Sequence, residues 1–323
     1  MQNALSRRKV LALSAAAGGT ALVPFGMPAQ AGSVPLLEWT GVSLGSVSTI
    51  RLAHPDRRIG EELLRRAVTE GRRLEAIFSL YRDDTVLSEL NRTGVLAGPP
   101  GDLVHLLNLC GEMWRMTDGA FDPTVQPLWH CYANHFSAAN ADPKGPPPQK
   151  LAEAVELIGW PGVHVSRDRI AFARRGMALT LNGIAQGYIT DRIVELLRQE
   201  GITSSLVDMG EIRTLGRHPD GRAWQTAIEA PAPQVRTLDL VDKAVATTSA
   251  SGFRFDADGR CNHLFNPATG RCAQPAIHRT VVASTAATAD AFSTALTLMD
   301  EDGTRRVLAR APGVQLYLDA GRR

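Results

Sequence analysis

The order in which helical and strand-like patterns follow one another most constrains the fold of this chain. Over residues 57–80, apolar side chains recur at the three- and four-residue spacing of an amphipathic helix, at Leu63, Leu64, Ala67, Leu74, Ile77 and Phe78. Further helices are predicted over residues 102–116, 151–158, 184–200 and 287–299. Strands are predicted over residues 163–165, 170–173, 205–207, 224–228, 238–241, 245–247, 279–283 and 314–318. Helices early in the chain, then strands interleaved with helices, are typical of a mixed α+β domain and not of a regular βαβ series.

Capping and loop signals mark some of the boundaries. Asp102 has the position of an N-cap for the second helix, and Gly201 that of the left-handed residue after the helix over 184–200. The stretch 142–148 contains four prolines and a glycine, so it is predicted to be a surface loop.

The first 31 residues have the three-part pattern of an export signal. Paired arginines lie in the block 6–11, a mildly apolar run extends to Met27, and Ala29-Gln30-Ala31 provides a small-residue cleavage site. The paired arginines indicate the twin-arginine (Tat) route. The alternative is a membrane anchor, but glycines and a proline interrupt the apolar run, whereas a spanning helix needs ~20 predominantly apolar residues. We therefore expect residues 32–323 to form a single periplasmic, soluble domain without stable membrane insertion.

Charge and cysteine spacing exclude two classes of protein. The signal holds three of the 35 basic residues and no acidic one, which leaves 32 basic and 33 acidic side chains. This balance gives no electrostatic basis for binding nucleic acid. The four cysteines form no CxxC pair, so a zinc or iron–sulfur centre is not expected. Cys261 and Cys272 could form a disulfide in an oxidising compartment. Because Tat substrates fold before export, we expect free buried thiols instead.

Two short segments carry oxygen ligands in a pattern that admits a functional and a structural interpretation. Asp290 and Thr294 lie four residues apart on a predicted helix, so their oxygens project from one face, which we expect to be exposed. A carboxylate and a hydroxyl suit Mg²⁺; the alternative is an N-cap Asp290 with a packed Thr294. Gly183 opens the helix over 184–200, where unpaired N–H groups attract anions.

Residues 120–122 (Ala120, Phe121 and Asp122) precede Pro123 and are predicted to form a loop of fixed geometry. Phe121 can pack on an aromatic ring, and Asp122 can accept hydrogen bonds from a sugar or base. The alternative is a structural turn that Asp122 closes.

Five segments taken together resemble the ApbE family of FAD:protein FMN transferases, over essentially the whole chain after the signal. In chain order they are YRDD at 81–84 with LSELN at 87–91, GAFDPTV at 119–125, LNGIAQGY at 181–188, NHLFNPATG at 262–270 and ADAFSTA at 289–295. The segment VDMGE at 207–211 lies between the third and the fourth. The resemblance implies one α+β domain with a helical N-terminal part and antiparallel or mixed sheets.

The resemblance also implies roles for particular residues. Asp290, Thr294 and the Gly183 carbonyl match the family's metal-binding positions, and Ser293 adds a ligand or a bond to one. The positions that contact FAD match Tyr81, Ala120, Phe121, Asp122, Thr180, Gln186 and Leu264. His263 matches a histidine needed for transfer, and an imidazole can relay a proton at neutral pH. Many relatives carry Lys and Asp at positions 186 and 180, and Asp at position 266, where this chain has Gln186, Thr180 and Asn266.

The activity implied is attack by a threonine or serine hydroxyl of an acceptor protein on the FMN-side phosphorus of FAD. AMP leaves, and Mg²⁺ binds the pyrophosphate. The Tat signal and the three departures are similar to the NosX branch of the family, which implies a respiratory membrane acceptor such as NosR. Two alternatives remain: a non-catalytic flavin-binding assembly factor, and an FAD pyrophosphatase in which water replaces the hydroxyl.

Overall fold

Two strands at the start of the described chain begin a large antiparallel sheet. The structure is a computed structural model that describes residues 34–43, 45–229, 235–275 and 277–318, so the predicted signal at 1–31 lies outside the described residues. Strand β1 (Leu36–Ser43) pairs with β2 (Ser46–Ala53) along its whole length. The sequence did not predict this hairpin, because Ser, Thr and Gly dilute its apolar pattern, and it shows that strands precede the first helix.

The large sheet has seven strands in the order β1-β2-β6-β7-β10-β11-β12, and every neighbouring pair is antiparallel. Its later strands are β6 (Ser205–Asp208), β7 (Ile212–Leu215), β10 (Ala244–Ser249), β11 (His278–Ala283) and β12 (Gln315–Leu318). Two small sheets accompany it: β3 (Val95–Ala97), β5 (Arg169–Phe172) and β4 (Val163–Val165) form one, and β8 (Trp224–Glu229) with β9 (Val235–Leu240) forms the other.

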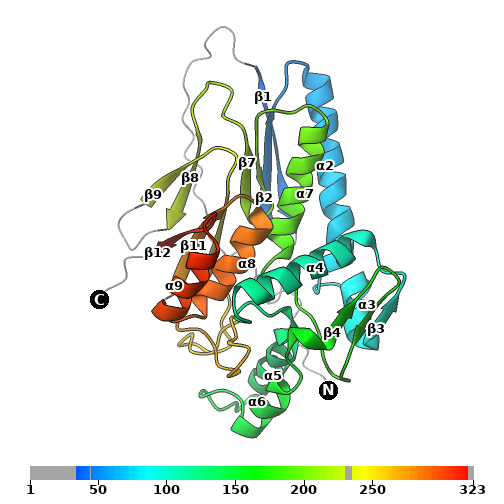
Figure 1. Cartoon of the computed structure of the whole chain (residues 1–323), viewed down its shortest axis with the longest axis vertical. Helices are drawn as coiled ribbons and strands as arrows, with labels where there is room; N and C mark the ends of the chain where they lie inside the picture. Colours follow the sequence, from blue (N-terminus) through cyan, green and yellow to red (C-terminus); the bar gives the residue numbers. More distant parts are fainter. Residues whose placement is uncertain (1–33, 44, 230–234, 276, 319–323) are drawn as a thin grey trace.

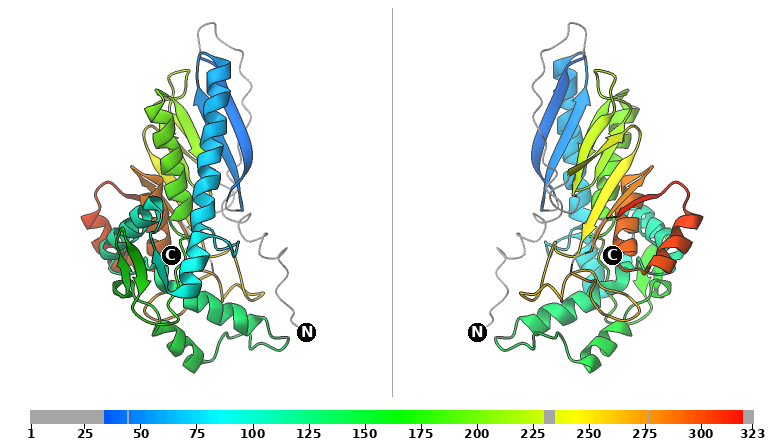
Figure 2. Two further views of the ribbon diagram at one scale, coloured as in Figure 1. Left: turned by 90° about the vertical axis from the view of Figure 1, so that its right-hand side faces the viewer. Right: turned by 90° about the vertical axis from the view of Figure 1, so that its left-hand side faces the viewer.

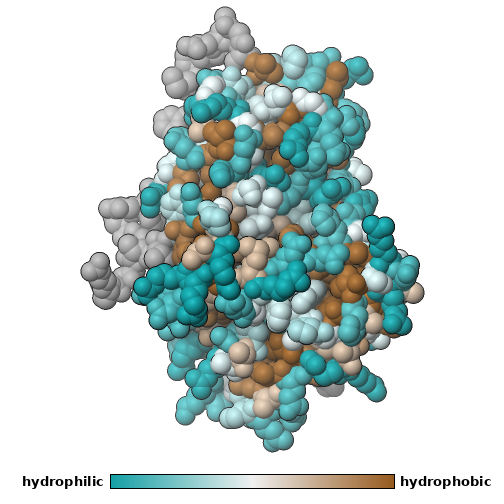
Figure 3. Space-filling view, in the orientation of Figure 1, coloured by the Kyte–Doolittle hydropathy of each residue, from teal (hydrophilic) through white to brown (hydrophobic). Residues whose placement is uncertain are grey.

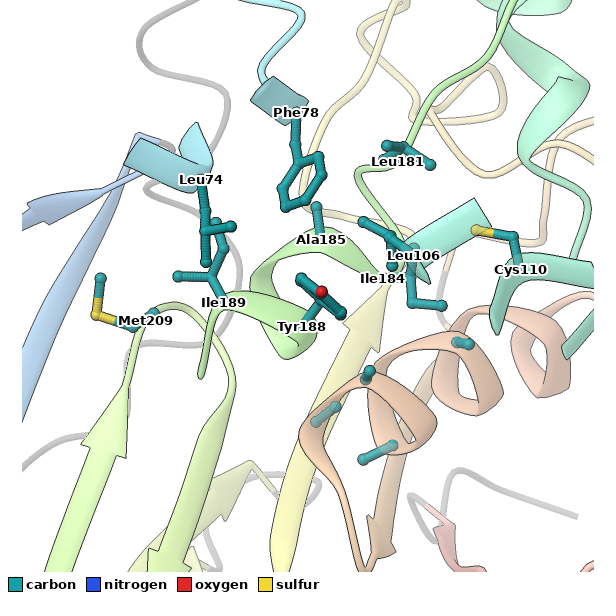
Figure 4. Close-up of a cluster of buried hydrophobic side chains, with 14 of the residues drawn as sticks. Leu74, Phe78, Leu106, Cys110, Leu181, Ile184, Ala185, Tyr188, Ile189 and Met209 are labelled. Atoms are coloured by element: carbon teal, nitrogen blue, oxygen red, sulfur yellow. The ribbon is translucent and has the colours of Figure 1, made fainter. Parts of the chain in front are cut away.

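Helices α2 (Arg57–Phe78), α7 (Ala185–Gln199) and α8 (Ala286–Thr297) cover one face of the large sheet (Figures 1 and 2). The predicted apolar stripe of α2 is entirely buried. Figure 4 shows side chains of α2, α4 (Gly101–Met116) and α7 meeting in this core. The β8–β9 hairpin packs on the opposite face of the sheet in a smaller apolar cluster. The other helices are α3 (Val86–Thr93), α5 (Gln126–Phe136), α6 (Pro148–Val155) and α9 (Glu301–Arg310).

The structure confirms each predicted helix and strand with shifted ends, and it corrects one cap. Helix α4 begins at Gly101 after Pro100, so Asp102 lies in its first turn and is not the N-cap. The carboxylate of Asp102 instead accepts bonds from Arg73 and Tyr188. Gly201 has φ 82° after the end of α7, as predicted. Helices α3, α5 and α9 and strands β3 and β7 were not predicted from the sequence. Helix α9 buries only Gly303 and Val307 and therefore has no wide apolar stripe.

The mixed α+β fold predicted from the sequence is confirmed. In the described part of the chain, no helix combines the length and apolar character needed to cross a bilayer. The surface seen in Figure 3 is mostly polar, with apolar side chains in small patches between charged ones. Isolated exposed apolar residues of this kind are ordinary for a folded protein.

Candidate active site

The first turns of α7 and α8 come into backbone contact. A Cβ atom added to Gly187 would lie 2.4 Å from the backbone oxygen of Ala286, so the approach requires a glycine. The N–H of Gly187 donates to Oδ2 of Asp290 at 3.3 Å. The contact therefore places the carboxylate of α8 beside the beginning of α7.

Among the described residues, this arrangement leaves the Gly183 carbonyl without a hydrogen-bond donor. The N–H of Gly187 would ordinarily bond to it, but that N–H points to Asp290, and no other described residue donates to the Gly183 oxygen. Gly183 also lies against Thr294, since a Cβ atom at Gly183 would lie 2.9 Å from the Thr294 Oγ1. The three predicted metal donors, Gly183, Asp290 and Thr294, thus lie together.

The amide groups at the start of α7 differ from the expectation of free donors. The N–H groups of Ile184 and Ala185 both donate to the Leu181 oxygen, at 3.0 and 2.8 Å. The helix itself begins at Ala185, two residues after Gly183. A tight turn therefore occupies these donors, and they are not available to an anion.

Hydroxyl groups from α8 and β10 meet on the sheet side of the same region. The Oγ atom of Ser293 is 2.6 Å from Thr248 Oγ1 and donates to the Asp290 carbonyl at 2.9 Å. Thr248 Oγ1 is also 3.4 Å from Thr294 Oγ1. Because the hydroxyl of Ser293 is bonded within the protein, direct ligation by this residue stays a prediction. Thr248 was not predicted, and no short motif marks it.

Buried carboxyl groups lie near one another in this region. Asp290 is only 4% exposed, so the expectation that it lies on an exposed helix face is wrong. Burial, with a further contribution from Asp191, raises the pKa of Asp290 to about 8. Burial and the charges of Asp290 and Asp208 raise the pKa of Glu211, and burial raises that of Asp208 to about 6. Burial is the largest cause of all three shifts, so the ionised forms of these carboxyl groups are disfavoured unless a positive charge lies beside them.

The donor set fits a hard divalent cation that a substrate completes. Among the described residues, no cluster of three or more His, Cys, Asp and Glu side chains could hold a metal ion. Asp290, Thr294 and the unpaired Gly183 carbonyl supply three oxygens of different kinds. Mg²⁺ typically uses one or two carboxylates and takes its remaining ligands from phosphate and water. The residues present are therefore compatible with magnesium bound together with a phosphate-bearing substrate.

His263 lies against the turn that continues strand β10. A Cβ atom at Gly252 would lie 3.3 Å from Cε1 of the His263 ring, and the Nδ1 of His263 is 3.3 Å from the Phe253 carbonyl oxygen. Because a carbonyl only accepts, Nδ1 carries the proton and Nε2 of the neutral ring keeps its lone pair. Burial lowers the pKa of His263, which favours this neutral form. Leu264, the next residue, is buried against Ala250 and Ala273.

Tyr81 and Thr180 lie at the other side of the turn before α7. The Tyr81 hydroxyl bonds to the Asn182 side chain, and the ring is 42% exposed. The N–H of Thr180 donates to the Pro123 oxygen at 2.8 Å. The structure therefore brings Tyr81, Thr180 and the 120–123 loop to the segment that carries Gly183.

Asp122 has the turn-closing role that the structural alternative described. One oxygen accepts from the Thr124 N–H and hydroxyl, at 2.8 and 2.5 Å. The other accepts from Trp114 Nε1 at 3.2 Å and from the Trp160 N–H at 3.1 Å. Phe121 is buried in the main core, and Ala120 packs against that core. Contact of these three residues with FAD stays a prediction.

Comparison with known proteins assigns the chain to a family. The model of the ApbE family matches residues 44–318. The chain belongs to the ApbE family. It is 28% identical over 260 residues to the FAD:protein FMN transferase of Haemophilus influenzae, covering 76% of this chain and 74% of that protein. It is 29% identical over 264 residues to the FAD:protein FMN transferase of Treponema pallidum, which covers 74% of this chain and 72% of that protein.

The fold is also similar to solved ApbE structures. Apo flavinyl transferase ApbE from Pseudomonas stutzeri superposes with a TM-score of 0.76 at 24% identity, over 91% of this chain and 94% of that one. An ApbE protein from Thermotoga maritima superposes with a TM-score of 0.77 at 25% identity, over 89% of this chain and 96% of that one.

Two of the positions at which the sequence was expected to differ from its relatives have local structural roles in this chain. The Gln186 amide donates to Ser46 Oγ at 2.9 Å and lies over Gly210, where a Cβ atom would be 2.4 Å from Gln186 Nε2. It thus ties α7 to the β1–β2 hairpin, a contact across 140 residues that no sequence pattern indicates. Asn266 Oδ1 accepts from the N–H groups of Ala268 and Thr269, at 3.0 and 3.1 Å, and so closes the turn after His263.

The four cysteines are free thiols in this structure. Cys110 and Cys261 are buried, whereas Cys131 and Cys272 are only partly so. The Cys272 thiol donates to the Asn262 carbonyl at 3.3 Å, which holds together the two sides of the hairpin that carries His263.

Proposed function

We propose that the chain transfers FMN from FAD to a threonine or serine hydroxyl of an acceptor protein and releases AMP, in a magnesium-dependent reaction. The observation that carries this proposal is that Gly183, in the turn before α7, lies together with Asp290 and Thr294 of α8, where the carboxyl groups of Asp290 and Glu211 are buried near each other. The relatives named FAD:protein FMN transferase support it.

The metal site and the base have separate places in this proposal. Asp290, Thr294 and the Gly183 carbonyl would hold Mg²⁺, which when bound neutralises phosphate charge and orients the pyrophosphate. Nε2 of His263 accepts the proton of the acceptor hydroxyl as its oxygen attacks phosphorus, because Nδ1 is occupied by the Phe253 carbonyl. Tyr81, Thr180 and the 120–122 loop would contact the flavin side of FAD.

The compartment and the acceptor are proposed from the sequence. The twin-arginine block at 6–11 and the cleavage site after Ala31 support export to the periplasm. The NosX-like departures support a respiratory membrane protein such as NosR as the acceptor.

The decisive experiment is flavin attachment to that acceptor. Purified chain is incubated with FAD, Mg²⁺ and the acceptor, and attached flavin is read as fluorescence in a denaturing gel while AMP is quantified. The matched control is the acceptor with its target threonine changed to alanine. Transfer predicts AMP formation that requires the hydroxyl. AMP released at an equal rate with the control acceptor would identify a pyrophosphatase, and the absence of both products would favour an assembly factor.

The pH dependence of transfer reports on His263. Burial lowers the pKa of His263 below the ordinary histidine value of about 6.5. A base acts in its neutral form, so lowering the pKa extends activity to lower pH. We expect the acid limb of kcat/KM to have its midpoint below pH 6.5, measured from initial rates of flavin attachment between pH 5 and 8. FAD binding over the same range is the control, and an acid limb above pH 6.5 would contradict the assignment.

A further inference from the structure

The carboxylate of Asp191 connects α7 to the first turn of α8. Its Oδ1 accepts the N–H of Ala286 at 2.8 Å, and its Oδ2 accepts the N–H of Ala287 at 2.9 Å. Arg213 of β7 donates from Nη1 to Asp191 Oδ1 at 2.6 Å. The side chains of Asp191 and Arg213 are 15% and 19% exposed, so both members of this ion pair are largely shielded from water.

These bonds are separate from the ordinary cap of α8. The N-cap of that helix is Thr285, whose hydroxyl accepts the N–H of Thr288. Thr285 therefore accepts one N–H of the first turn of α8 from within the same segment. Asp191, which belongs to α7, accepts two further N–H groups of that turn. The first turn of α8 thus has one local cap and one contact that fixes it to α7.

The contact sets the position of the predicted metal donors. Gly187 and Asp191 lie four residues apart, on one face of α7, and both contact the first turn of α8. The turn before α7 carries Gly183, and α8 carries Asp290 and Thr294. Any slide of α8 along α7 would change the separation between the Gly183 carbonyl and those two side chains.

We propose that Asp191, oriented by Arg213, is a positioning residue that fixes α8 on α7 and so holds the three metal donors in register. This inference rests on the proposed metal-dependent function, but it concerns a residue outside the donor set. A carboxylate is suited to the task because it accepts two N–H groups and an arginine at once, and its charge is favourable at a helix N-terminus.

The test compares Asp191→Asn with Thr285→Ala, which removes the local cap of the same helix. The full chain is titrated with Mn²⁺ alone and again with saturating FAD, and bound metal is measured by electron paramagnetic resonance. We expect Asp191→Asn to raise the metal dissociation constant by roughly 10–100-fold, the effect of losing a group that orients metal ligands. Thr285→Ala should leave the constant within about twofold, since it frays α8 without freeing it from α7.

Amide hydrogen exchange is the independent structural readout. Asp191→Asn should increase amide exchange at Ala286 and Ala287. Thr285→Ala should increase amide exchange at Thr288. The proposal would be overturned if the two variants lost metal affinity equally, or if Asp191→Asn bound Mn²⁺ like the wild type. A wild-type chain that binds no Mn²⁺, with or without FAD, would also overturn it. If Asp191→Asn does not fold, Arg213→Gln decides by the same criteria, with a loss of affinity expected. Metal binding by a wild-type chain that transfers no FMN would refute the proposed function alone, because the metal constants still test Asp191.

Discussion

Asp290→Asn is expected to reduce flavin attachment by about 10³-fold or more, because a metal that neutralises phosphate charge contributes several kcal/mol to the rate. Asn retains the size of the side chain and one oxygen but loses the charge that faces the cation. Initial rates of AMP formation and of acceptor fluorescence at saturating FAD measure the loss. Activity at the wild-type level, in the variant or in the wild type with excess chelator, would refute the magnesium mechanism.

A second aspartate provides the control for Asp290. Asp300 is the N-cap of α9 and accepts the N–H of Gly303 at 2.7 Å. Asp300→Ala should therefore cost about 1 kcal/mol of unfolding free energy and leave transfer unchanged. Asp290→Asn should instead reduce transfer without lowering the free energy of unfolding. It removes a buried carboxylate that faces Glu211, so urea denaturation of the metal-free protein should show no loss of stability.

His263→Ala is expected to slow transfer by ~10²–10⁴-fold, the usual contribution of a positioned general base, while FAD binding persists. The ring lies against Gly252 and bonds to the Phe253 carbonyl, whereas the predicted flavin contacts Tyr81 and Thr180 lie beside the turn before α7. A time course of flavin attachment and a fluorescence titration of FAD separate the two properties.

The outcome for His263 also separates the candidate functions. A transferase loses acceptor-dependent AMP formation in the variant, and an assembly factor loses nothing because it has no chemical step. His130, an exposed residue whose Nε2 is 3.2 Å from Gln126 Nε2, is the control histidine. Transfer by His130→Ala at the wild-type rate shows that the effect is specific, and equal losses in both variants would exclude His263 as the base.

Features that depend on neighbours in sequence were determined by the sequence. The spacing of apolar residues in α2 predicted both the helix and its buried stripe. The four-residue interval between Asp290 and Thr294 placed their side chains on one face of α8 wherever that helix packs. The motif order and Gly201 likewise indicated the family and the end of α7, because short-range geometry depends only on local residues.

Tertiary structure alone decided which residues meet in the candidate site. The burial of Asp290, a Gly183 carbonyl that no described residue bonds, and the contacts of Thr248 and Asp191 arise where segments distant in the chain meet. Ser46 and Gln186 are 140 residues apart, and no periodicity relates them. The pKa shifts follow the same rule, since desolvation and neighbouring charges depend on packing and not on residue type. The sequence thus determined which side chains are present, and the packing of α7 against α8 decided which of them meet.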